Sequence, residues 1–259
     1  MTPSLLRRWP GTAHLRSSRS RGLSDVRRLY PLGLWFPARG NALAFNNASL
    51  PDASLTTPPP LICFHGTVAS GGSWMPLVEE LRDRPVACPT YGNRGTAPIT
   101  QCVDEAWEVV QDVLTRTGAH QVDLVGHSLG ARVADEIVAR FSERRDGDSI
   151  FPIRKVVALG GTHLGLPKPW WSPLAPVFAG SAVRQQFGTR SRKTGAVPGT
   201  ESVQWSDVHG SADVIVPAAP GATVVDRVPH HLLPSSPRVA KVIAEILRDD
   251  TQKRQASGE

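Results

Sequence analysis

The sequence predicts an α/β fold with a mostly parallel central sheet and helices on both of its faces. Short apolar runs recur from residue 61 onwards, and stretches with helical spacing of apolar residues lie between and after them. Strands that alternate with helices pair in parallel, and such a sheet is covered on both faces. The 259 residues, 40% of them hydrophobic, are enough to bury one sizeable core.

Residues 1–57 differ from the rest of the chain. They contain eight arginines and two acidic residues, which gives a charge of +6, whereas the remaining chain has 21 basic and 21 acidic residues. Apolar periodicity is low in this segment, and the proline run that follows it, 58–60, cannot be helical. We therefore expect 1–57 to be a basic, disordered N-terminal extension of a domain that covers 58–250.

The extension also bears on localisation and partners. It has no continuous apolar run of the about 7 to 15 residues found in secretory signals, which favours a cytoplasmic protein, with a transit peptide as the alternative for so arginine-rich a start. No stretch of the chain approaches the ~20 apolar residues of a transmembrane segment. The neutral charge balance after residue 57 argues against a nucleic-acid partner. The sequence carries no signal for an oligomeric state.

Six short apolar runs are predicted to be strands, because turn residues or helical patterns separate them. They are 61–65, 85–91, 121–127, 154–160, 202–208 and 222–228. Apolar residues at helical spacing predict amphipathic helices that include 103–114, 133–141 and 239–247. Residues 251–259 are expected to form a polar C-terminal tail.

The stretch 166–200 interrupts this alternation, because it is too rich in Pro, Gly and Ser for a regular crossover. Loops longer than about 15 residues in a compact domain are usually functional or disordered. We expect a cap or lid-like insertion, with a plain surface loop as the alternative. Its Trp170 and Trp171, together with Leu174 and Phe178, would cover an apolar substrate, and ordinary packing is the alternative for these side chains.

The segment Gly126-His127-Ser128-Leu129-Gly130 follows a predicted strand and precedes a predicted helix. A G-x-S-x-G sequence in that context is typical of a nucleophile elbow, a sharp turn that exposes the serine hydroxyl and needs small neighbours. The alternative is a tight turn with a capping serine. We interpret Ser128 as a nucleophile.

A serine hydroxyl needs a base to accept its proton and an acid to orient that base. With this elbow the acid and then the histidine follow along the chain. Asp213 lies just after the predicted strand 202–208, and Asp226 is a competing acid that we interpret as structural or exposed. His230 and His231 both follow the last predicted strand, and the spacing does not choose between them.

The segment His65-Gly66-Thr67 ends the first predicted strand. Its turn would place backbone N–H groups beside the elbow, so the amides of Thr67 and Leu129 are predicted to bind the oxyanion of a tetrahedral intermediate. A simple turn at the end of a strand is the alternative. His65 is expected to brace this turn, and His127 to be a packed neighbour of the site.

With these segments the chain resembles the α/β-hydrolases, and more narrowly bacterial triacylglycerol lipases and esterases of actinobacterial type. The segments are "HGT", "PTYGNRGTAPI", "VLTRTGAHQVDLVGHSLG", "ADVIVP" and "HHLLPSSP". Such lipases have H-x-x-L-P-x-x-P after the base histidine, a pattern that fits His230 and misses His231 by one residue. The segment "ALGGTHLG" resembles "LGTPHxG" of related lipases, which implies that Thr162 and His163 line the acyl site.

Together these observations predict that 58–250 is the catalytic domain of a serine carboxylic-ester hydrolase, a lipase or esterase acting through an acyl-enzyme on lipid or other apolar acyl esters. Ser128, Asp213 and His230 form the expected triad, and the expected partner is a small-molecule ester or lipid. An acyltransferase, a hydrolase of non-lipid esters or lactones, and a catalytically silent binding protein are the alternatives. Cys63, Cys88 and Cys102 form no CxxC pair and no His/Cys cluster, so no metal and no cofactor are expected.

Overall fold

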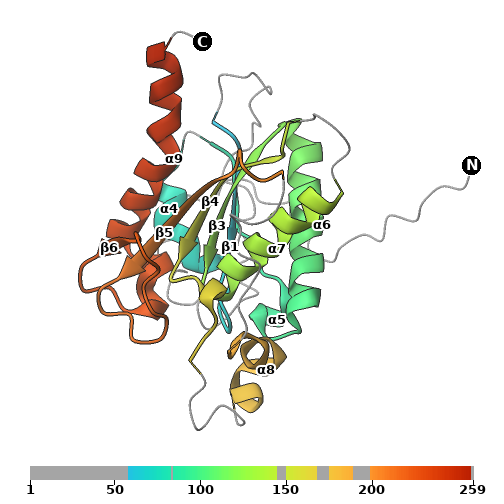
Figure 1. Ribbon diagram of the computed structural model, residues 1–259, viewed down its shortest axis with the longest axis vertical. Helices are drawn as coiled ribbons and strands as arrows, with labels where there is room; N and C mark the ends of the chain where they lie inside the picture. The colour runs from blue at the N-terminus through green and yellow to red at the C-terminus, as the bar shows by residue number, and fades with distance from the viewer. Residues whose placement is uncertain (1–57, 83, 145–149, 168–174, 189–198, 258–259) are drawn as a thin grey trace, which may run out of the picture.

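A six-stranded, entirely parallel sheet forms the centre of the computed structural model (Figure 1). The structure describes residues 58–82, 84–144, 150–167, 175–188 and 199–257, so the predicted extension 1–57 and the side chains of Trp170 and Trp171 lie outside it. The strands lie in the order β2-β1-β3-β4-β5-β6. They are β1 Leu61–Phe64, β2 Val86–Ala87, β3 Val122–His127, β4 Ile153–Leu159, β5 Gln204–Gly210 and β6 Thr223–Val225.

Helices cover both faces of this sheet, as Figure 1 shows. On one face lie α6 (Ile99–Thr117) and α7 (Leu129–Glu143), and on the other α4 (Met75–Glu80) and α9 (Pro237–Ser257). The shorter elements are η2 Gly71–Trp74, α5 Gly92–Gly95, η3 Thr162–Leu164, α8 Ala175–Gln186 and η6 His230–Ser235. The fold class predicted from the sequence is confirmed.

Element boundaries differ from the predictions where local chemistry interferes. β2 has two residues instead of the predicted 85–91, and it stops before Pro89, which has no N–H to offer to a neighbouring strand. α9 continues through most of the stretch that we expected to be a tail, as far as Ser257. The predicted insertion contains α8, which packs against α6.

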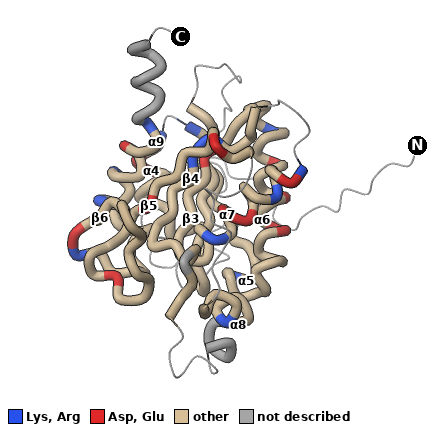
Figure 2. The backbone as a smooth tube through the Cα atoms, viewed as in Figure 1, with Lys and Arg blue, Asp and Glu red and all other residues tan. Residues whose placement is uncertain are grey.

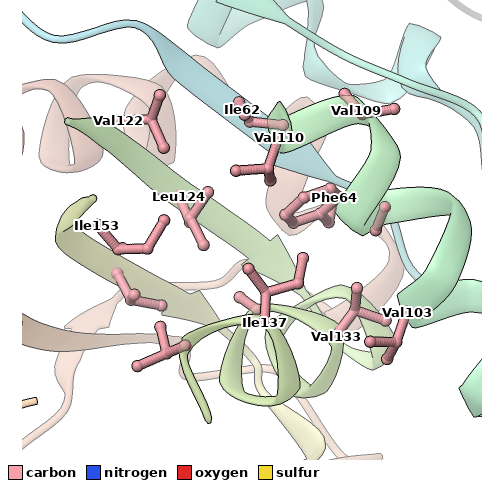
Figure 3. Close-up of a cluster of buried hydrophobic side chains, with 14 of the residues drawn as sticks. Ile62, Phe64, Val103, Val109, Val110, Val122, Leu124, Val133, Ile137 and Ile153 are labelled. Atoms are coloured by element: carbon pink, nitrogen blue, oxygen red, sulfur yellow. The ribbon is translucent and has the colours of Figure 1, made fainter. Parts of the chain in front are cut away.

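The core has two layers because side chains alternate along each strand. In β1, Ile62 and Phe64 join the cluster under α6 and α7, whereas Leu61 and Cys63 join the cluster under α4 and α9. Figure 3 shows part of the first cluster, where Leu124 of β3 and Ile137 of α7 point into the same layer. Burying each such large side chain contributes about 1.5–3 kcal/mol, which fixes the strand register on which the site depends.

All three cysteines are buried free thiols. Cys63 and Cys88 lie in the same buried cluster, and burial raises the pKa of the Cys63 thiol well above its usual value. Cys102 lies elsewhere, on α6, where its Sγ would meet any side chain added at Gly92. In these positions the thiols fill core space.

A buried ionic cluster, formed by Asp123, Arg84 and Arg154, closes the opposite edge of the sheet from the elbow. The Asp123 carboxylate, with a side chain that is 0% exposed, accepts hydrogen bonds from Arg84 Nη2 at 2.7 Å and from Arg154 Nη2 at 2.6 Å. Arg154 also donates to the carbonyl of Leu247, which ties α9 to the start of β4. We call this group the Asp123 cluster.

Surface charge follows the balance expected from the sequence. In Figure 2 basic and acidic residues are interspersed over the helices and loops. Within the described ranges, no helix combines the length and the apolar character needed to cross a bilayer.

Candidate active site

Ser128 forms a strained corner between β3 and α7. Its backbone has φ 53° and ψ −115°, in the region of positive φ that non-glycine residues rarely adopt. Its amide donates to the carbonyl of Leu159 at the end of β4, and its carbonyl accepts from the amide of Ala131 in the first turn of α7. A conformation of this kind costs about 1–3 kcal/mol and persists when its surroundings hold it in place.

The two glycines of the elbow are required by close backbone contacts. A Cβ at Gly126 would lie 2.4 Å from the Cα of Ala131, and one at Gly130 would lie 2.1 Å from the carbonyl oxygen of Phe64. Both contacts are far shorter than van der Waals distance, and both involve backbone atoms that cannot move aside. The glycines therefore let α7 begin directly against β1 and β3, which holds Ser128 at the corner.

Asp213 and His230 meet at the same edge of the sheet, in the loops after β5 and β6. His230 Nδ1 donates to Asp213 Oδ2 at 2.7 Å, and the Asp213 side chain is 0% exposed. The other carboxylate oxygen accepts from the amides of Ile215 at 2.9 Å and Val216 at 3.0 Å. Because a carboxylate can only accept, this contact requires a proton on Nδ1, so in the neutral form of the imidazole the free lone pair is on Nε2.

The charged form of Asp213 is favoured by these contacts. Burial by itself raises the pKa of the carboxyl, but the hydrogen bond from His230 and those from the amides of Val216 and Ile215 outweigh it and lower the pKa. Asp213 therefore stays ionised and holds the imidazole of His230 in one tautomer.

The structure separates the competing residues. His231 is exposed, whereas His230 is buried and bonded to Asp213. Asp226 is exposed and accepts a hydrogen bond from the hydroxyl of Ser211, as the structural or exposed interpretation predicts.

His230 is tied to the residue that precedes Ser128. His127 Nε2 donates to the backbone carbonyl of His230 at 3.0 Å, and the two rings lie 4.7 Å apart between centroids. Gly160, after β4, also borders the pair, because a Cβ there would lie 3.1 Å from both His230 Nδ1 and Asp213 Oδ2. The ends of β3, β4, β5 and β6 thus bring Ser128, His230 and Asp213 to one edge of the sheet.

His127 is a packed neighbour, as expected. Burial lowers its pKa well below the usual value for histidine, and the adjacent ring of His230 lowers it further. The imidazole is therefore neutral, and its Nδ1 is buried without a hydrogen-bond partner. A Cβ at Gly66 would lie 2.9 Å from this atom, so the turn after β1 packs directly on His127.

The turn after β1 approaches Ser128 closely. A Cβ at Gly66 would lie 3.1 Å from the Cβ of Ser128. Val68 in this turn has φ 58°, an uncommon value for a β-branched residue, and it is held by Arg94 from both sides. The Val68 amide donates to the Arg94 carbonyl at 2.8 Å, and Arg94 Nη2 donates to the Val68 carbonyl at 2.8 Å. Thr67 and Leu129, the first residue of α7, both border Gly95, because a Cβ there would lie 3.2 Å from Thr67 Cα and 3.2 Å from Leu129 Cδ2.

His65 braces this turn, which confirms the expectation from the sequence. It is fully buried, donates from Nδ1 to the carbonyl of Gly66 at 2.8 Å, and accepts at Nε2 from the amide of Tyr91 at 3.3 Å. Tyr91 also stacks on the imidazole and donates its hydroxyl to the His65 carbonyl at 2.6 Å. Burial lowers the pKa of His65 to about 4, so the ring is neutral at pH 7.

Thr162 and His163 lie in η3, directly after β4. Thr162 is fully buried, and its amide donates to the carbonyl of Ser128 at 3.4 Å. Its hydroxyl oxygen lies 3.3 Å from the same carbonyl oxygen, but the shorter contact of the hydroxyl, at 2.9 Å, is the one to Gln186 Oε1. His163 Nε2 lies 3.4 Å from Asp207 Oδ1, and both side chains are partly exposed. Burial raises the pKa of Asp207, which His163 partly offsets. The predicted substrate contact of His163 stays a prediction.

Two residues at this edge escaped the sequence analysis. His209 lies with its Nδ1 3.9 Å from Asp213 Oδ2. Gln186, at the end of α8, is 1% exposed and hydrogen-bonds both Thr67 and Thr162. A glutamine in a segment without apolar periodicity gives no signal by itself, because its partners lie far away in the chain.

In the part of the chain that the structure describes, no group of three or more His, Cys, Asp or Glu side chains is placed to hold a metal ion.

Comparisons with other proteins agree on one fold. Residues 61–256 match the model of the Alpha/beta hydrolase family. A 2-succinyl-6-hydroxy-2,4-cyclohexadiene-1-carboxylate synthase from Yersinia enterocolitica is 32% identical over 81 residues, which are 30% of this chain and 29% of that protein. The aligned part thus spans less than a third of this relative.

Solved structures share the fold at low identity. An N-acyl homoserine lactonase, AidH, complexed with N-butanoyl homoserine, has a TM-score of 0.52 at 16% identity, over 75% of this chain and 90% of that one. The product of lin2722 from Listeria innocua has a TM-score of 0.51 at 16% identity, over 73% and 93%. An esterase from a marine microorganism has a TM-score of 0.51 at 13% identity, over 72% and 94%.

Proposed function

Because the chain belongs to the alpha/beta hydrolase family, we propose that it is a serine carboxylic-ester hydrolase, a lipase or esterase that acts through an acyl-enzyme on lipid or other apolar acyl esters. The observation that carries the proposal is the hydrogen bond of 2.7 Å between His230 Nδ1 and Asp213 Oδ2, at the sheet edge where Ser128 forms a strained corner. Family membership supports hydrolase chemistry, and the residues at this edge suit an ester substrate.

In the proposed acylation step, His230 Nε2 accepts the proton of the Ser128 hydroxyl while the oxygen attacks the ester carbonyl carbon. The carbonyl oxygen becomes an oxyanion, which accepts hydrogen bonds from the amides of Thr67 and Leu129. When the tetrahedral intermediate collapses, the alcohol leaves with the proton from His230, and the acyl group stays on Ser128. In the deacylation step, His230 accepts a proton from a water molecule, whose oxygen attacks the acyl carbonyl carbon. The carboxylic acid is released when the second intermediate collapses and Ser128 takes the proton back from His230.

Asp213 has two tasks in this scheme. Its hydrogen bond to Nδ1 holds His230 in the tautomer that can accept a proton at Nε2, and its negative charge stabilises the imidazolium that forms. The backbone amides of Ile215 and Val216 keep the carboxylate oriented toward His230. Asp213 therefore acts as a fixed anion and takes up no proton itself.

The proposed binding site for the acyl chain is apolar. Trp170 and Trp171 would cover the acyl chain, and His163 would line its site. Each CH₂ of an acyl chain buried there would contribute about 0.8 kcal/mol, so the specificity for longer chains would rise until the site is filled.

The test is hydrolysis of p-nitrophenyl esters from acetate to palmitate, with labelling by a fluorophosphonate probe. Ser128→Ala and His230→Ala should each lower kcat by about 10⁴- to 10⁶-fold and abolish labelling. His231→Ala is the matched control, because His231 is the adjacent, exposed histidine, and it should keep wild-type activity.

Several outcomes would contradict the proposal. Loss of activity in His231→Ala with activity kept in His230→Ala would overturn the choice of base. Absence of both labelling and turnover in the wild type would favour a silent binding protein. Ester products formed in the presence of alcohol acceptors would indicate an acyltransferase, and turnover restricted to lactones or other small esters would replace the lipid substrate class.

A further inference from the structure

Helix α8 is fastened to the body of the protein next to the candidate site. Figure 1 places it beyond the edge of the sheet, beside α5. Gln185 Oε1 accepts from the amide of Ile99 at 2.8 Å, and the Ser181 hydroxyl donates to the carbonyl of Thr96 at 3.3 Å. A Cβ at Gly180 would lie 2.1 Å from the same Thr96 carbonyl oxygen, so the two segments are in direct contact. The end of α8 is therefore held at a fixed distance from the site.

Gln186 carries the side chain that reaches the site. It is 1% exposed. Its Oε1 accepts from the hydroxyl of Thr162 at 2.9 Å, and its Nε2 donates to the carbonyl of Ala182 at 3.1 Å and to the hydroxyl of Thr67 at 3.4 Å. The Ala182 carbonyl fixes which way the amide points, because it accepts only from the NH₂ end. Each polar end of this buried side chain is thus paired.

Thr67 lies in the turn that would supply one oxyanion donor, and Thr162 hydrogen-bonds the elbow that would supply the other. Thr67 is itself one of the proposed donors, through its backbone amide. Thr162 holds the carbonyl of Ser128, which accepts from the Thr162 amide at 3.4 Å. That carbonyl belongs to the same planar peptide group as the N–H of Leu129, so a bond that orients the carbonyl orients the N–H in the opposite direction.

We propose that Gln186 is a positioning residue that sets the relative placement of the Thr67 and Leu129 amides in the oxyanion site. Its side-chain amide hydrogen-bonds Thr67 in the turn after β1 and Thr162 in the turn after β4. Thr162 in turn hydrogen-bonds the carbonyl of Ser128 in the elbow. This inference rests on the proposed function, because it assigns Gln186 a part in the same reaction. Since the Gln186 side chain is buried and both ends of its amide are paired within the protein, we assign it an effect on the alignment of the two donors.

The expected consequence is a loss of transition-state stabilisation with little loss of substrate binding. The charge on the carbonyl oxygen develops only in the transition state, so misaligned donors lower kcat and leave KM nearly unchanged. Complete removal of one oxyanion donor typically costs about 10²- to 10³-fold in kcat. We expect a smaller effect from misalignment, about 10- to 100-fold.

The experiment compares Gln186→Met with Gln185→Met. Methionine keeps the length of glutamine and removes its hydrogen bonds, and the two variants differ by one position on the same helix. Both are assayed with the best p-nitrophenyl ester, per active site titrated with fluorophosphonate, and for binding of an alkylboronic acid, which forms a tetrahedral adduct with the serine. Gln186→Met should lose about 10- to 100-fold in kcat and a similar factor in boronate affinity, with KM within about 2-fold. Gln185→Met removes the bond to the Ile99 amide but leaves the contacts of Gln186 in place, so it should lose much less than Gln186→Met in kcat and in boronate affinity.

Thr67→Val and Thr67→Ser give a second route that does not depend on the folding of Gln186→Met. Valine removes the hydroxyl that accepts from Gln186 and leaves the backbone amide, so it should reproduce part of the loss in kcat, and serine should restore it. Because the two side chains act through one contact, the double variant Thr67→Val with Gln186→Met should lose no more than Gln186→Met alone.

The inference is overturned if Gln186→Met and Thr67→Val keep wild-type kcat and boronate affinity per active site, or if the loss is entirely in KM. It is also overturned if Gln185→Met and Gln186→Met lose kcat equally, because a general loosening of α8 would then explain both. A wild type that neither hydrolyses esters nor binds the boronate would reject the proposed function itself, whereas an active wild type with an indifferent Gln186 rejects this inference alone.

Discussion

The two edges of the sheet each bury an aspartate, and the partners of the two carboxylates differ. At the edge where the strands start, Asp123 is bonded to Arg84 and Arg154. At the edge where they end, Asp213 is bonded to His230 and to two backbone amides. β3 connects the two regions, because Asp123 lies near its start and Ser128 directly follows its end.

The partners decide what each edge can do. A guanidinium stays charged at every pH a protein meets, so the Asp123 cluster is a fixed set of charges that ties strands and α9 together. An imidazole changes charge near neutral pH and can accept a proton at its free nitrogen. A buried aspartate is therefore part of a structural ion cluster at one edge, and at the other it orients a histidine that is suited to proton transfer.

Backbone strain is distributed in the same way. In the described part of the chain, the non-glycine residues with positive φ are Val68, Asn93, Arg94, Ser128 and Arg227. They lie in the turns that follow β1, β2, β3 and β6, at the edge that holds the candidate site. Strain of this kind is destabilising and is found at functional sites, where the surroundings maintain it. The Asp123 cluster, which stabilises the fold, and the candidate site around Ser128 thus lie at opposite ends of the strands.

The largest expected effect is on activity, at Asp213. Asp213→Asn should lower kcat by about 10⁴-fold, because an amide no longer selects the tautomer of His230 that keeps Nε2 free. The unfolding free energy should change far less than this factor implies, since the amide keeps the shape of the side chain. Kinetics with the p-nitrophenyl esters and urea unfolding of the same preparation measure both. A kcat within about 10-fold of the wild type would exclude the proposed role of Asp213.

The next effect is on stability, at Asp123. Asp123→Asn removes the negative charge that faces the buried Arg84 and the partly buried Arg154, which should cost about 3–5 kcal/mol of unfolding free energy. The folded fraction should keep its kcat, because the site is at the other edge. Urea unfolding measures the loss, and Asp112→Asn is the control, because the pair of Asp112 with Arg116 is solvent-exposed. A loss of kcat per active site with unchanged stability would contradict the division between the edges.

Low pH should destabilise the protein at the edge that holds the candidate site, because His65 and His127 are buried there as neutral side chains. Both have pKa values lowered by burial, to about 4 for His65, so the unfolded chain binds more protons than the native one below the ordinary histidine pKa of about 6.5. The stabilisation that comes from the two neutral histidines is therefore fully present above about pH 6.5. As the pH falls from about 6.5 toward 4, the free energy of unfolding decreases by up to about 1.4 kcal/mol per pH unit for each of the two groups. Urea midpoints from pH 7 to pH 4.5, expected to fall steadily over about that range, measure it. In Asp123→Asn the urea midpoint should fall with the same slope against pH, because this variant leaves both histidines unchanged. A urea midpoint that does not change with pH in the wild type would contradict the expected effect of His65 and His127.

The smallest expected effect is at Asp226, the competing acid of the sequence analysis. Asp226→Asn should leave kcat within about 2-fold and the unfolding free energy within about 0.5 kcal/mol, because its contacts with Ser211 and Arg227 are exposed. Steady-state kinetics and urea unfolding check this. A loss of kcat close to that of Asp213→Asn would indicate that Asp226 has the role that we propose for Asp213.

Much of the fold and part of the site could be predicted from the sequence. Apolar runs indicated each strand that the structure describes. β1 and β3 are buried along their whole length, as continuous hydrophobic sequence requires, whereas β5 and β6 are partly exposed. β2 was overestimated, since Pro89 ends its ladder. The elbow at Ser128 was predictable because everything that produces it, two glycines and a turn between a strand and a helix, lies within a few residues. The positions of the proposed acid and of the two candidate bases followed from their order along the chain, whereas the prediction of His230 over His231 needed a resemblance to known lipases.

The sequence by itself determined the local features of this protein: which segments become strands and helices, and where a serine is forced into a strained corner. Only the tertiary structure decided which distant side chains meet, as with Asp123 and its two arginines, His209 beside Asp213, and Gln186 between Thr67 and Thr162. The physical reason is that local conformation depends on neighbours in the chain, whereas a hydrogen bond across 119 positions depends on strand order and register.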